Sequence, residues 1–482
     1  MSEGKTKLKR TLSFAPAYGA AVGLVVSGTA MFSVGNVAGT TGYGTFISAF
    51  IALIPMMMTA FAFGELTAML PGGGMISDYT MPALGRFFAA FALLSGYVVL
   101  IAADGGTQLV MGGLSAEEIC GVPQIAVTLV LFAIVFIINI LNVDFYGKVE
   151  SVITILMMVT FAAFAIAGNV RIGEAAGIAT PVNAGKGIMP EGGFKTILGA
   201  TGSAIWFFIG FEFACPMAEE NKKPYKNIPY ALIFGLITIY IVDSLFATAA
   251  VRYTDLNELS TSTVPQTVAA KAILGKAGYI IMTLLTIMAS FTTANAYMAS
   301  LPRMLYGLAK EGMVPAFFGK VNKRFRTPVY GIIFTGILIL ATTLFITING
   351  ADVSLVQGLI NVACITWMVS YGIAMIDVLV LRKKYPDFPR LWKAPMAKVS
   401  MTVGIIGVIF SIYTLRDSLV YALICMGVVA AYILIWGKIK KIRLTEVTDI
   451  KDTVMNIRDR SEYLEVWDEA VDEWCKKNDG KL

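Results

Sequence analysis

Apolar runs of about 20 residues recur along most of the chain, separated by short polar or basic connections. An α-helix of that length can cross the hydrocarbon core of a bilayer, which is about 30 Å thick. The pattern therefore predicts an all-α membrane protein with about 12 transmembrane helices. We expect these helices at residues 17–39, 43–69, 86–113, 123–143, 149–168, 195–217, 228–250, 278–307, 329–348, 354–380, 400–416 and 418–437.

The composition agrees with this prediction, since 57% of the 482 residues are hydrophobic and 15% are charged. The basic N-terminus leads into an apolar run that continues as a full span, so we expect no cleaved signal peptide. Five cysteines lie far apart without a CxxC pair, which argues against a zinc site or a disulfide framework. Histidine is absent, which excludes imidazole as a pH switch.

Basic residues cluster in connections that all fall on one side of the membrane if the number of spans is even. Short cytoplasmic loops carry an excess of lysine and arginine, so we expect a cell (inner) membrane protein with both termini in the cytoplasm. These loops also account for the net charge of +6, and no nucleic acid partner is expected. The clusters lie at residues 5–10, 222–226, 320–326 and 382–393.

The C-terminal segment differs in character, because residues 444–482 carry eleven acidic and six basic residues. Within it, residues 446–474 place apolar side chains mostly three or four positions apart, which predicts a cytosolic amphipathic helix. Two interpretations remain open. The helix packs beneath the membrane domain, or it forms a regulatory or partner-binding tail.

The first expected span contains an interruption, where the apolar sequence AVGLVVSGTAMF includes Ser27, Gly28 and Thr29. The bilayer core offers no water, so an unpaired backbone group there costs several kcal/mol. Irregular backbone at that depth is tolerated where it lines a cavity or a substrate site. The triplet therefore predicts a binding site inside the membrane.

A second interruption lies in the sixth span, where Gly210 is followed two residues later by Glu212. The first and sixth spans correspond if the chain consists of two five-helix halves. Paired interruptions at corresponding positions are typical of inverted-repeat transporters, which bind substrate near the midplane. The expected parts are a cytosolic N-terminus at 1–16, repeats at 17–168 and 195–380, two additional transmembrane helices at 400–437, and the tail at 444–482.

Four motifs resemble the amino acid–polyamine–organocation (APC) superfamily, and the likeness covers about residues 15–440. They are VVSGTAMF at 25–32, EL with PGGG between 65 and 74, GFE at 210–212 with AEENKKP at 218–224, and PRMLYG at 302–307 with KEGMVP at 310–315. The resemblance implies a LeuT-type fold, a 5+5 inverted repeat with two more helices. It implies that backbone N–H groups of the broken first helix bind a substrate carboxylate, and that carbonyls of the broken sixth helix bind the amino group. A helix N-terminus independently favours an anion.

On this basis we expect Ser27, Gly28 and Thr29 to form the carboxylate site, and Trp206 and Ile209 to border the second break at Gly210.

Residues 206–212, WFFIGFE, also resemble the W-x-F-x-G-x-E pattern of bacterial arginine/agmatine exchangers. This likeness implies that Trp206 belongs to the substrate gate and that Glu212 is a candidate proton sensor. It places Tyr297 where an aromatic ring stacks on a cationic side chain, a contact that contributes ~0.5–2 kcal/mol. The alternative is that Tyr297 faces lipid or packs in the core.

Asp104 lies within the third span, where a carboxylate is costly and marks function by default. It either faces a substrate cation or accepts a hydrogen bond from a backbone or tyrosine group. Glu65 and Asp243 carry less weight, since the first stands near a helix end and the second is compatible with a structural role.

Ion coupling is constrained by the fifth and eighth spans. Some proton-coupled relatives place a lysine in the fifth span, and residues 149–168 contain none. In the eighth span, Ser290, Thr292 and Thr293 are weak candidate sodium ligands, although hydroxyl groups also bond to their own helix backbone.

These features predict a secondary active transporter of amino acids or related amines that works by alternating access. We expect an exchanger that prefers cationic substrates. The alternatives are a proton- or sodium-coupled symporter of neutral amino acids, and a transporter-like nutrient sensor. No nucleophile–base arrangement or metal cluster indicates an enzyme, and no cofactor is expected. The expected partners are the small-molecule substrate and membrane lipid, and a homodimer is left open.

Overall fold

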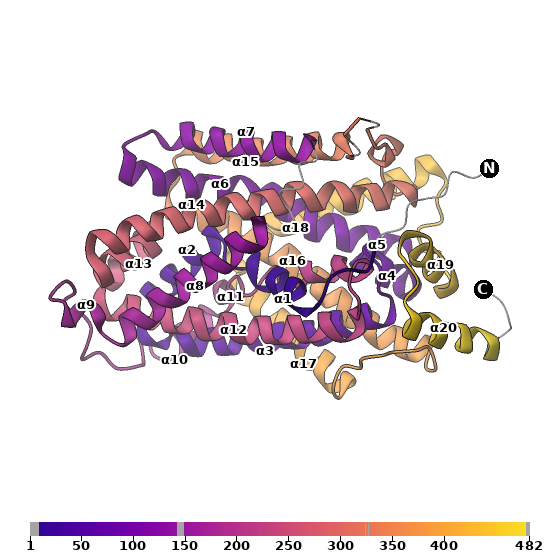
Figure 1. Ribbon diagram of the computed structural model, residues 1–482, viewed down its shortest axis with the longest axis horizontal. Helices are drawn as coiled ribbons and strands as arrows, with labels where there is room; N and C mark the ends of the chain where they lie inside the picture. The colour runs from indigo at the N-terminus through magenta and orange to yellow at the C-terminus, as the bar shows by residue number, and fades with distance from the viewer. Residues whose placement is uncertain (1–8, 142–148, 323, 326, 479–482) are drawn as a thin grey trace.

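The computed structural model describes residues 9–141, 149–322, 324–325 and 327–478. In these ranges nearly all regular secondary structure is helical. Many of the long helices run along the longest dimension of the molecule (Figure 1). The β-pairing recorded within these ranges is one isolated bridge between Leu12 and Asn221. The predicted all-α class is confirmed.

The helices follow one another with short connections. The α-helices are α1 Phe14–Gly23, α2 Gly28–Thr41, α3 Thr45–Met69, α4 Ile76–Leu84, α5 Arg86–Leu93, α6 Val99–Cys120, α7 Gln124–Leu141, α8 Val149–Asn169, α9 Ile172–Ala175, α10 Phe194–Gly199, α11 Thr201–Ile205, α12 Pro224–Tyr253, α13 Leu256–Thr261, α14 Pro265–Lys310, α15 Val329–Asn349, α16 Val353–Lys384, α17 Ala397–Thr414, α18 Arg416–Lys440, α19 Ile450–Arg460 and α20 Glu465–Lys477. The tighter or wider turns are η1 Gly42–Gly44, η2 Leu94–Val98, η3 Phe211–Glu219 and η4 Ala316–Gly319.

Within the described ranges, nine helical segments are long and apolar enough to cross a membrane. The three predicted crossings without a segment of their own in this set are the first, the fifth and the sixth. The first and sixth are broken, and the second half of the first, α2, joins α3 in one candidate segment, Gly28–Met69. The fifth corresponds to α8, of which residues Ile153–Asn169 form a shorter apolar helix. The number of crossings therefore stays a prediction, with nine candidate spans found among the described residues.

Both predicted interruptions are breaks in the backbone. Helix α1 ends at Gly23 and α2 begins at Gly28, with Ser27 between them in an extended conformation. The Ser27 hydroxyl accepts a hydrogen bond of 3.1 Å from the N–H of Ala30, which caps the N-terminus of α2. In the sixth span, α11 gives way to η3 at Gly210, whose φ of +108° favours glycine.

Two elements differ in extent from the prediction. The eighth span, expected at 278–307, belongs to α14, which starts at Pro265 and is kinked at Leu274 and Gly275. The amphipathic tail forms two helices, α19 and α20, instead of one. Ser461 is extended and ends α19, and the Asp468 carboxylate accepts the Leu464 N–H at 2.6 Å, which starts α20. Periodicity alone did not reveal this local capping.

The N- and C-terminal ends of the described chain lie at the same end of the molecule, and α19 and α20 lie beside α4 and α5 there (Figure 1). The indole N–H of Trp467 in α20 donates a 2.9 Å hydrogen bond to the carbonyl of Met69, at the end of α3. Of the two interpretations of the tail, packing against the membrane domain is therefore present in the structure.

Candidate substrate-binding site

The start of α2 lies against α6 through the side chain of Gln108. The N–H of Thr29 donates to Oε1 of Gln108 at 3.3 Å, and Nε2 of Gln108 donates to Oγ1 of Thr29 at 2.6 Å. The same Nε2 donates to Oδ2 of Asp104 at 2.9 Å. Gln108 was missed by the sequence analysis. Its signal was a polar residue one helical turn after Asp104, on the same face of an apolar helix.

The two broken spans meet at the hydroxyl of Thr29. The indole N–H of Trp206, at the end of α11, donates to Oγ1 of Thr29 at 3.1 Å. The side chain of Leu24, at the first break, packs against Gly210, because a Cβ on Gly210 would lie 3.0 Å from Cδ2 of Leu24. Ile209 is buried in the unwound stretch between Trp206 and Gly210. The structure thus brings the two predicted interruptions together.

Asp104 and Tyr297 form a buried polar pair at the same place. The Tyr297 hydroxyl, on α14, donates to Oδ2 of Asp104 at 2.8 Å, and both residues are buried. Tyr297 therefore lies inside the helix bundle instead of facing lipid. Asp104 thus accepts a hydrogen bond from a tyrosine hydroxyl, which was one of the two predicted roles for this carboxyl group. Its Oδ1 is buried and has no hydrogen-bond partner among the described residues.

The three hydroxyl groups of the eighth span behave differently. Thr292 donates to the carbonyl of Ala289 at 3.1 Å, so its hydroxyl bonds to its own helix. The hydroxyls of Ser290 and Thr293 are buried without a hydrogen-bond partner in the described chain. Ser290 lies beside the first break, because a Cβ on Gly28 would come 2.7 Å from its Oγ. Ser290 therefore lies where it could contribute to the candidate site, whereas the Thr292 hydroxyl bonds within its own helix.

Glu212 lies in a cage of aromatic side chains. Its Oε1 accepts from Tyr97 at 3.2 Å and its Oε2 accepts from Tyr371 at 2.5 Å. The ring of Trp367 packs edge-on against Trp206 with centroids 6.5 Å apart, and against Tyr97 at 5.6 Å. Aromatic side chains of the third and tenth spans therefore lie between Glu212 and Trp206 and connect the two by direct contacts.

The sequence analysis did not identify Tyr97, Trp367 and Tyr371. Tyrosines in apolar spans carry no sequence signal that would separate a carboxylate partner from a core residue.

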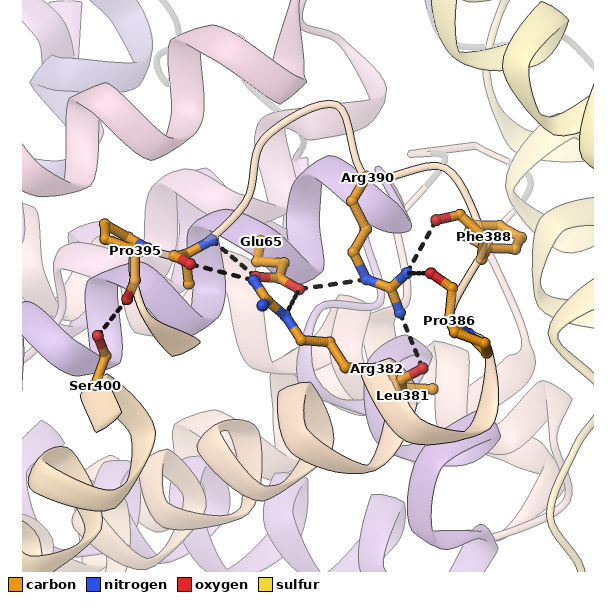
Figure 2. Close-up of polar contacts among 9 residues, drawn as sticks. Glu65, Leu381, Arg382, Pro386, Phe388, Arg390, Pro395 and Ser400 are labelled. Atoms are coloured by element: carbon orange, nitrogen blue, oxygen red, sulfur yellow. Dashed lines mark hydrogen bonds and ion pairs between the residues drawn. The ribbon is translucent and has the colours of Figure 1, made fainter. Parts of the chain in front are cut away.

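Glu65 lies away from this site, in the ion-pair cluster of Figure 2. Its carboxylate accepts two hydrogen bonds from Arg382, at 2.7 and 2.5 Å, and lies 3.3 Å from Nε of Arg390. The N–H of Ala394 donates to the same carboxylate at 2.8 Å. Glu65 therefore ties α3 to the end of α16 and to the connection that follows, a structural role.

A groove of about 580 Å³ opens between the end of α2, α13 and the start of α16. Its polar lining includes Asn36, Ser260 and Asp352. α13 lies at the end of the molecule opposite to α19 and α20 (Figure 1). The groove and the tail therefore lie at opposite ends of the bundle, with the two breaks between them.

Nine candidate membrane spans among the described residues, together with predicted first and sixth spans that are broken where they meet, agree with a LeuT-type transporter fold, and this predicted fold class is confirmed. The fold is similar to that of the manganese transporter of Eremococcus coleocola. The superposition covers 94% of this chain and 99% of that protein, with a TM-score of 0.58. The sequence identity is 11%, so this likeness concerns the fold alone.

The chain belongs to the amino acid permease family, whose model matches residues 12–436, and hence to the APC superfamily. It is 25% identical to the branched-chain amino acid permease BcaP of Bacillus subtilis, over 86% of this chain and 90% of that protein. It is 28% identical to the lysine-specific permease LysP of Lactococcus lactis, over 71% of this chain and 74% of that protein. The family and these relatives are transporters, not enzymes.

Proposed function

We propose that the chain exchanges amino acids or related amines across the cell membrane by alternating access, with a preference for cationic substrates. The observation that carries this preference is the free Oδ1 of Asp104, a buried carboxylate oxygen without a partner in the described residues. A buried charge requires a partner, and a substrate ammonium or guanidinium group supplies one.

The broken helices supply the groups that every amino acid needs. The free N–H groups and partial positive charge at the start of α2 favour a carboxylate beside Ser27 and Gly28. The unwound stretch before Gly210 offers backbone carbonyls to an amino group. Asp104, Gln108 and Tyr297 then meet the side chain of the substrate.

The names of the relatives include both neutral and cationic substrates. Branched-chain amino acids stand beside lysine, and another relative, 26% identical over 63% of this chain, is the D-serine/D-alanine/glycine transporter of Escherichia coli. Membership of the family therefore does not determine which amino acid side chain the substrate carries. Asp104 favours the cationic group.

The burial of the site supports alternating access. Thr29 and Asp104 have no solvent exposure, so substrate must enter and leave through movements of the surrounding helices. The groove near Asn36 is the entrance we propose on the outer side. We place both termini in the cytoplasm, in line with the basic connections at their end of the molecule. Opening on that side would involve the short helix α1.

Counterflow into proteoliposomes preloaded with lysine tests the proposal. Labelled lysine should enter against unlabelled lysine, and arginine, ornithine or a polyamine should compete. Competition by neutral amino acids alone would refute the cationic preference. Binding without any flux would instead support the nutrient sensor.

A further inference from the structure

Asp243 is a buried carboxyl group that the proposed substrate site does not use. It lies on α12, whose lipid face carries Phe234, Ile241 and Leu245, and it falls on the opposite, interior stripe with Ile239. Its exposed fraction is 8%. Within the described residues it has no hydrogen-bond or ion-pair partner.

The carboxyl of Asp243 faces a small cavity of about 10 Å³ behind the break of the first span. This volume is close to the minimum that holds one water molecule. The rest of the wall is apolar, and it comes from the break, α2, α8 and α12. The apolar lining residues are Val25, Val26, Ala30, Met31, Phe161 and Ile239.

A pair of aromatic rings covers the cavity on its α8 side. Phe161 of α8 lines it and packs on Phe246 of α12, with ring centroids 4.5 Å apart. On the α1 side, Gly23 allows close packing, because a Cβ there would lie 2.5 Å from Thr154 on α8. A movement of α1 away from α8 would therefore expose the cavity.

Several titratable groups on the helices packed against α12 have hydrogen-bond partners of their own. They are Tyr18 of α1, bonded to Thr238; Tyr43 of η1, bonded to the Asn183 carbonyl; Glu65 of α3, bonded to Arg382; Glu212 and Glu219 of η3, bonded to Tyr371 and the Gly73 N–H; and Tyr297 of α14, bonded to Asp104. The remaining groups are Cys215 of η3 and, on α14, Lys271 over the ring of Tyr279, Lys310 over the ring of Tyr306, Lys276 and Arg303. None of them forms a hydrogen bond or ion pair with Asp243 among the described residues. Helix α2 and the described side chains of α8 contain no titratable group. Asp243 is left without a counter-charge.

We propose that Asp243 is a proton-binding site that couples substrate transport to a proton gradient. A carboxyl without a partner in an apolar cavity is accommodated as the neutral acid. When α1 moves and water enters, the acid gives its proton to water, and the carboxylate takes a proton from water when the carrier is open to the other side. The inference rests on the proposed transport function and adds net, proton-linked uptake to the exchange of substrates.

The cavity favours a proton over a metal cation. A hard cation takes several oxygen ligands, whereas the wall of this cavity holds one carboxyl group and otherwise apolar side chains. Among the described residues, no group of three or more acidic or cysteine side chains could hold a metal ion.

The test uses the full chain in proteoliposomes that enclose a pH-sensitive dye. Asp243→Asn mimics the neutral acid and removes the proton site. Asp377→Asn is the matched control, because Asp377 is also buried but accepts a 2.6 Å hydrogen bond from Thr80. Lysine uptake into empty liposomes is driven by an inward proton gradient, and lysine counterflow is measured without a gradient.

We expect the wild type and Asp377→Asn to acidify the lumen during uptake. Asp243→Asn should lose this acidification and at least tenfold of the gradient-driven uptake while it keeps its counterflow. Proton movement retained by Asp243→Asn, gradient-driven lysine uptake by the wild type without proton movement, or uptake that requires sodium in place of protons would each overturn the inference. Failure of counterflow in the wild type would instead refute the transport function.

If Asp243→Asn exchanges lysine poorly, the proton count is measured instead by calorimetry of lysine binding in two buffers of different ionisation enthalpy. Binding to the wild type should take up protons, and binding to Asp243→Asn should take up about one fewer. An equal proton count in the two proteins would overturn the assignment.

Discussion

The hydroxyl of Tyr297 on α14 donates a 2.8 Å hydrogen bond to Oδ2 of Asp104 on α6, while Oδ1 of the same carboxyl remains without a partner in the described chain. The tyrosine thereby fixes the orientation of the carboxyl group. A rigid carboxylate loses little conformational freedom when a substrate cation binds, so the pair is suited to select charge.

Asp104→Asn should weaken the binding of lysine much more than that of leucine. A hydrogen bond to a charged group contributes about 1.5–3 kcal/mol, so we expect about a 10- to 100-fold loss of lysine affinity. Competition in counterflow and ligand-induced thermal shifts measure it. Tyr297→Phe is the control, since it keeps the carboxylate and should reduce affinity only several-fold. Equal losses for lysine and leucine would contradict the role of Asp104.

Gly210→Ala should destabilise the contact between the two broken spans. The φ of +108° at this position is unfavourable for alanine, and such strain costs about 1–3 kcal/mol. The new Cβ would also lie 3.0 Å from Cδ2 of Leu24. We expect a lower midpoint of thermal unfolding and slower exchange. In Gly199→Ala, on the same span, a Cβ meets no atom within 4 Å, so wild-type behaviour is expected there.

The breaks could be predicted from the sequence because local chemistry marks them. Small and hydroxyl residues at Ser27, Gly28 and Thr29 interrupt an apolar run, and the backbone does break between α1 and α2. Gly210 marks the second break, and its positive φ explains the residue type. In both places the cause lies within a few residues, which is the range that a sequence pattern covers.

The partners of the site residues could not be predicted, because they are distant in the chain. Glu212 meets Tyr371, 159 positions later, and Glu65 meets Arg382, 317 positions later (Figure 2). Such pairs depend on how the spans pack. Gln108 is intermediate, since its spacing from Asp104 was visible but its bond to Thr29 was not.

Glu212→Gln should separate gating from binding. The carboxylate accepts hydrogen bonds from Tyr97 and Tyr371, whereas a glutamine amide presents one acceptor oxygen and one donor nitrogen to the two hydroxyls. Glu212 forms its hydrogen bonds with Tyr97 and Tyr371 and none with Asp104 or Thr29 in the described chain. We therefore expect a lysine affinity within about threefold of the wild-type value, but a loss of pH dependence in the exchange rate.

Tyr371→Phe is the companion variant to Glu212→Gln. It keeps the carboxylate, so its exchange rate should still depend on pH, with the profile displaced. A Glu212→Gln protein whose exchange retains the wild-type pH profile would exclude Glu212 as the proton-sensitive gate.

Arg460→Gln should loosen the C-terminal tail. The guanidinium forms ion pairs of 2.7 Å with Asp78 at the start of α4 and 2.8 Å with Glu219 at the end of η3. Hydrogen bonds to charged groups contribute about 1.5–3 kcal/mol, and we expect the lower end because the Arg460 side chain is partly exposed. Limited proteolysis between α19 and α20 should therefore become faster.

The loosening should also depend on pH. Burial raises the pKa of Glu219, and the charge of Arg460 acts in the opposite direction. A carboxyl whose pKa is higher in the docked tail than in the free tail favours docking at low pH, and this stabilisation is lost as the pH rises through the docked-state value. In Arg460→Gln the carboxylate of Glu219 loses its main counter-charge, so its pKa rises further. Cleavage of Arg460→Gln should therefore accelerate more steeply than cleavage of the wild type as the pH rises. Lys476→Gln removes an equal charge from an exposed position of α20 and should match the wild type; equal cleavage of all three proteins would show that Arg460 does not hold the tail.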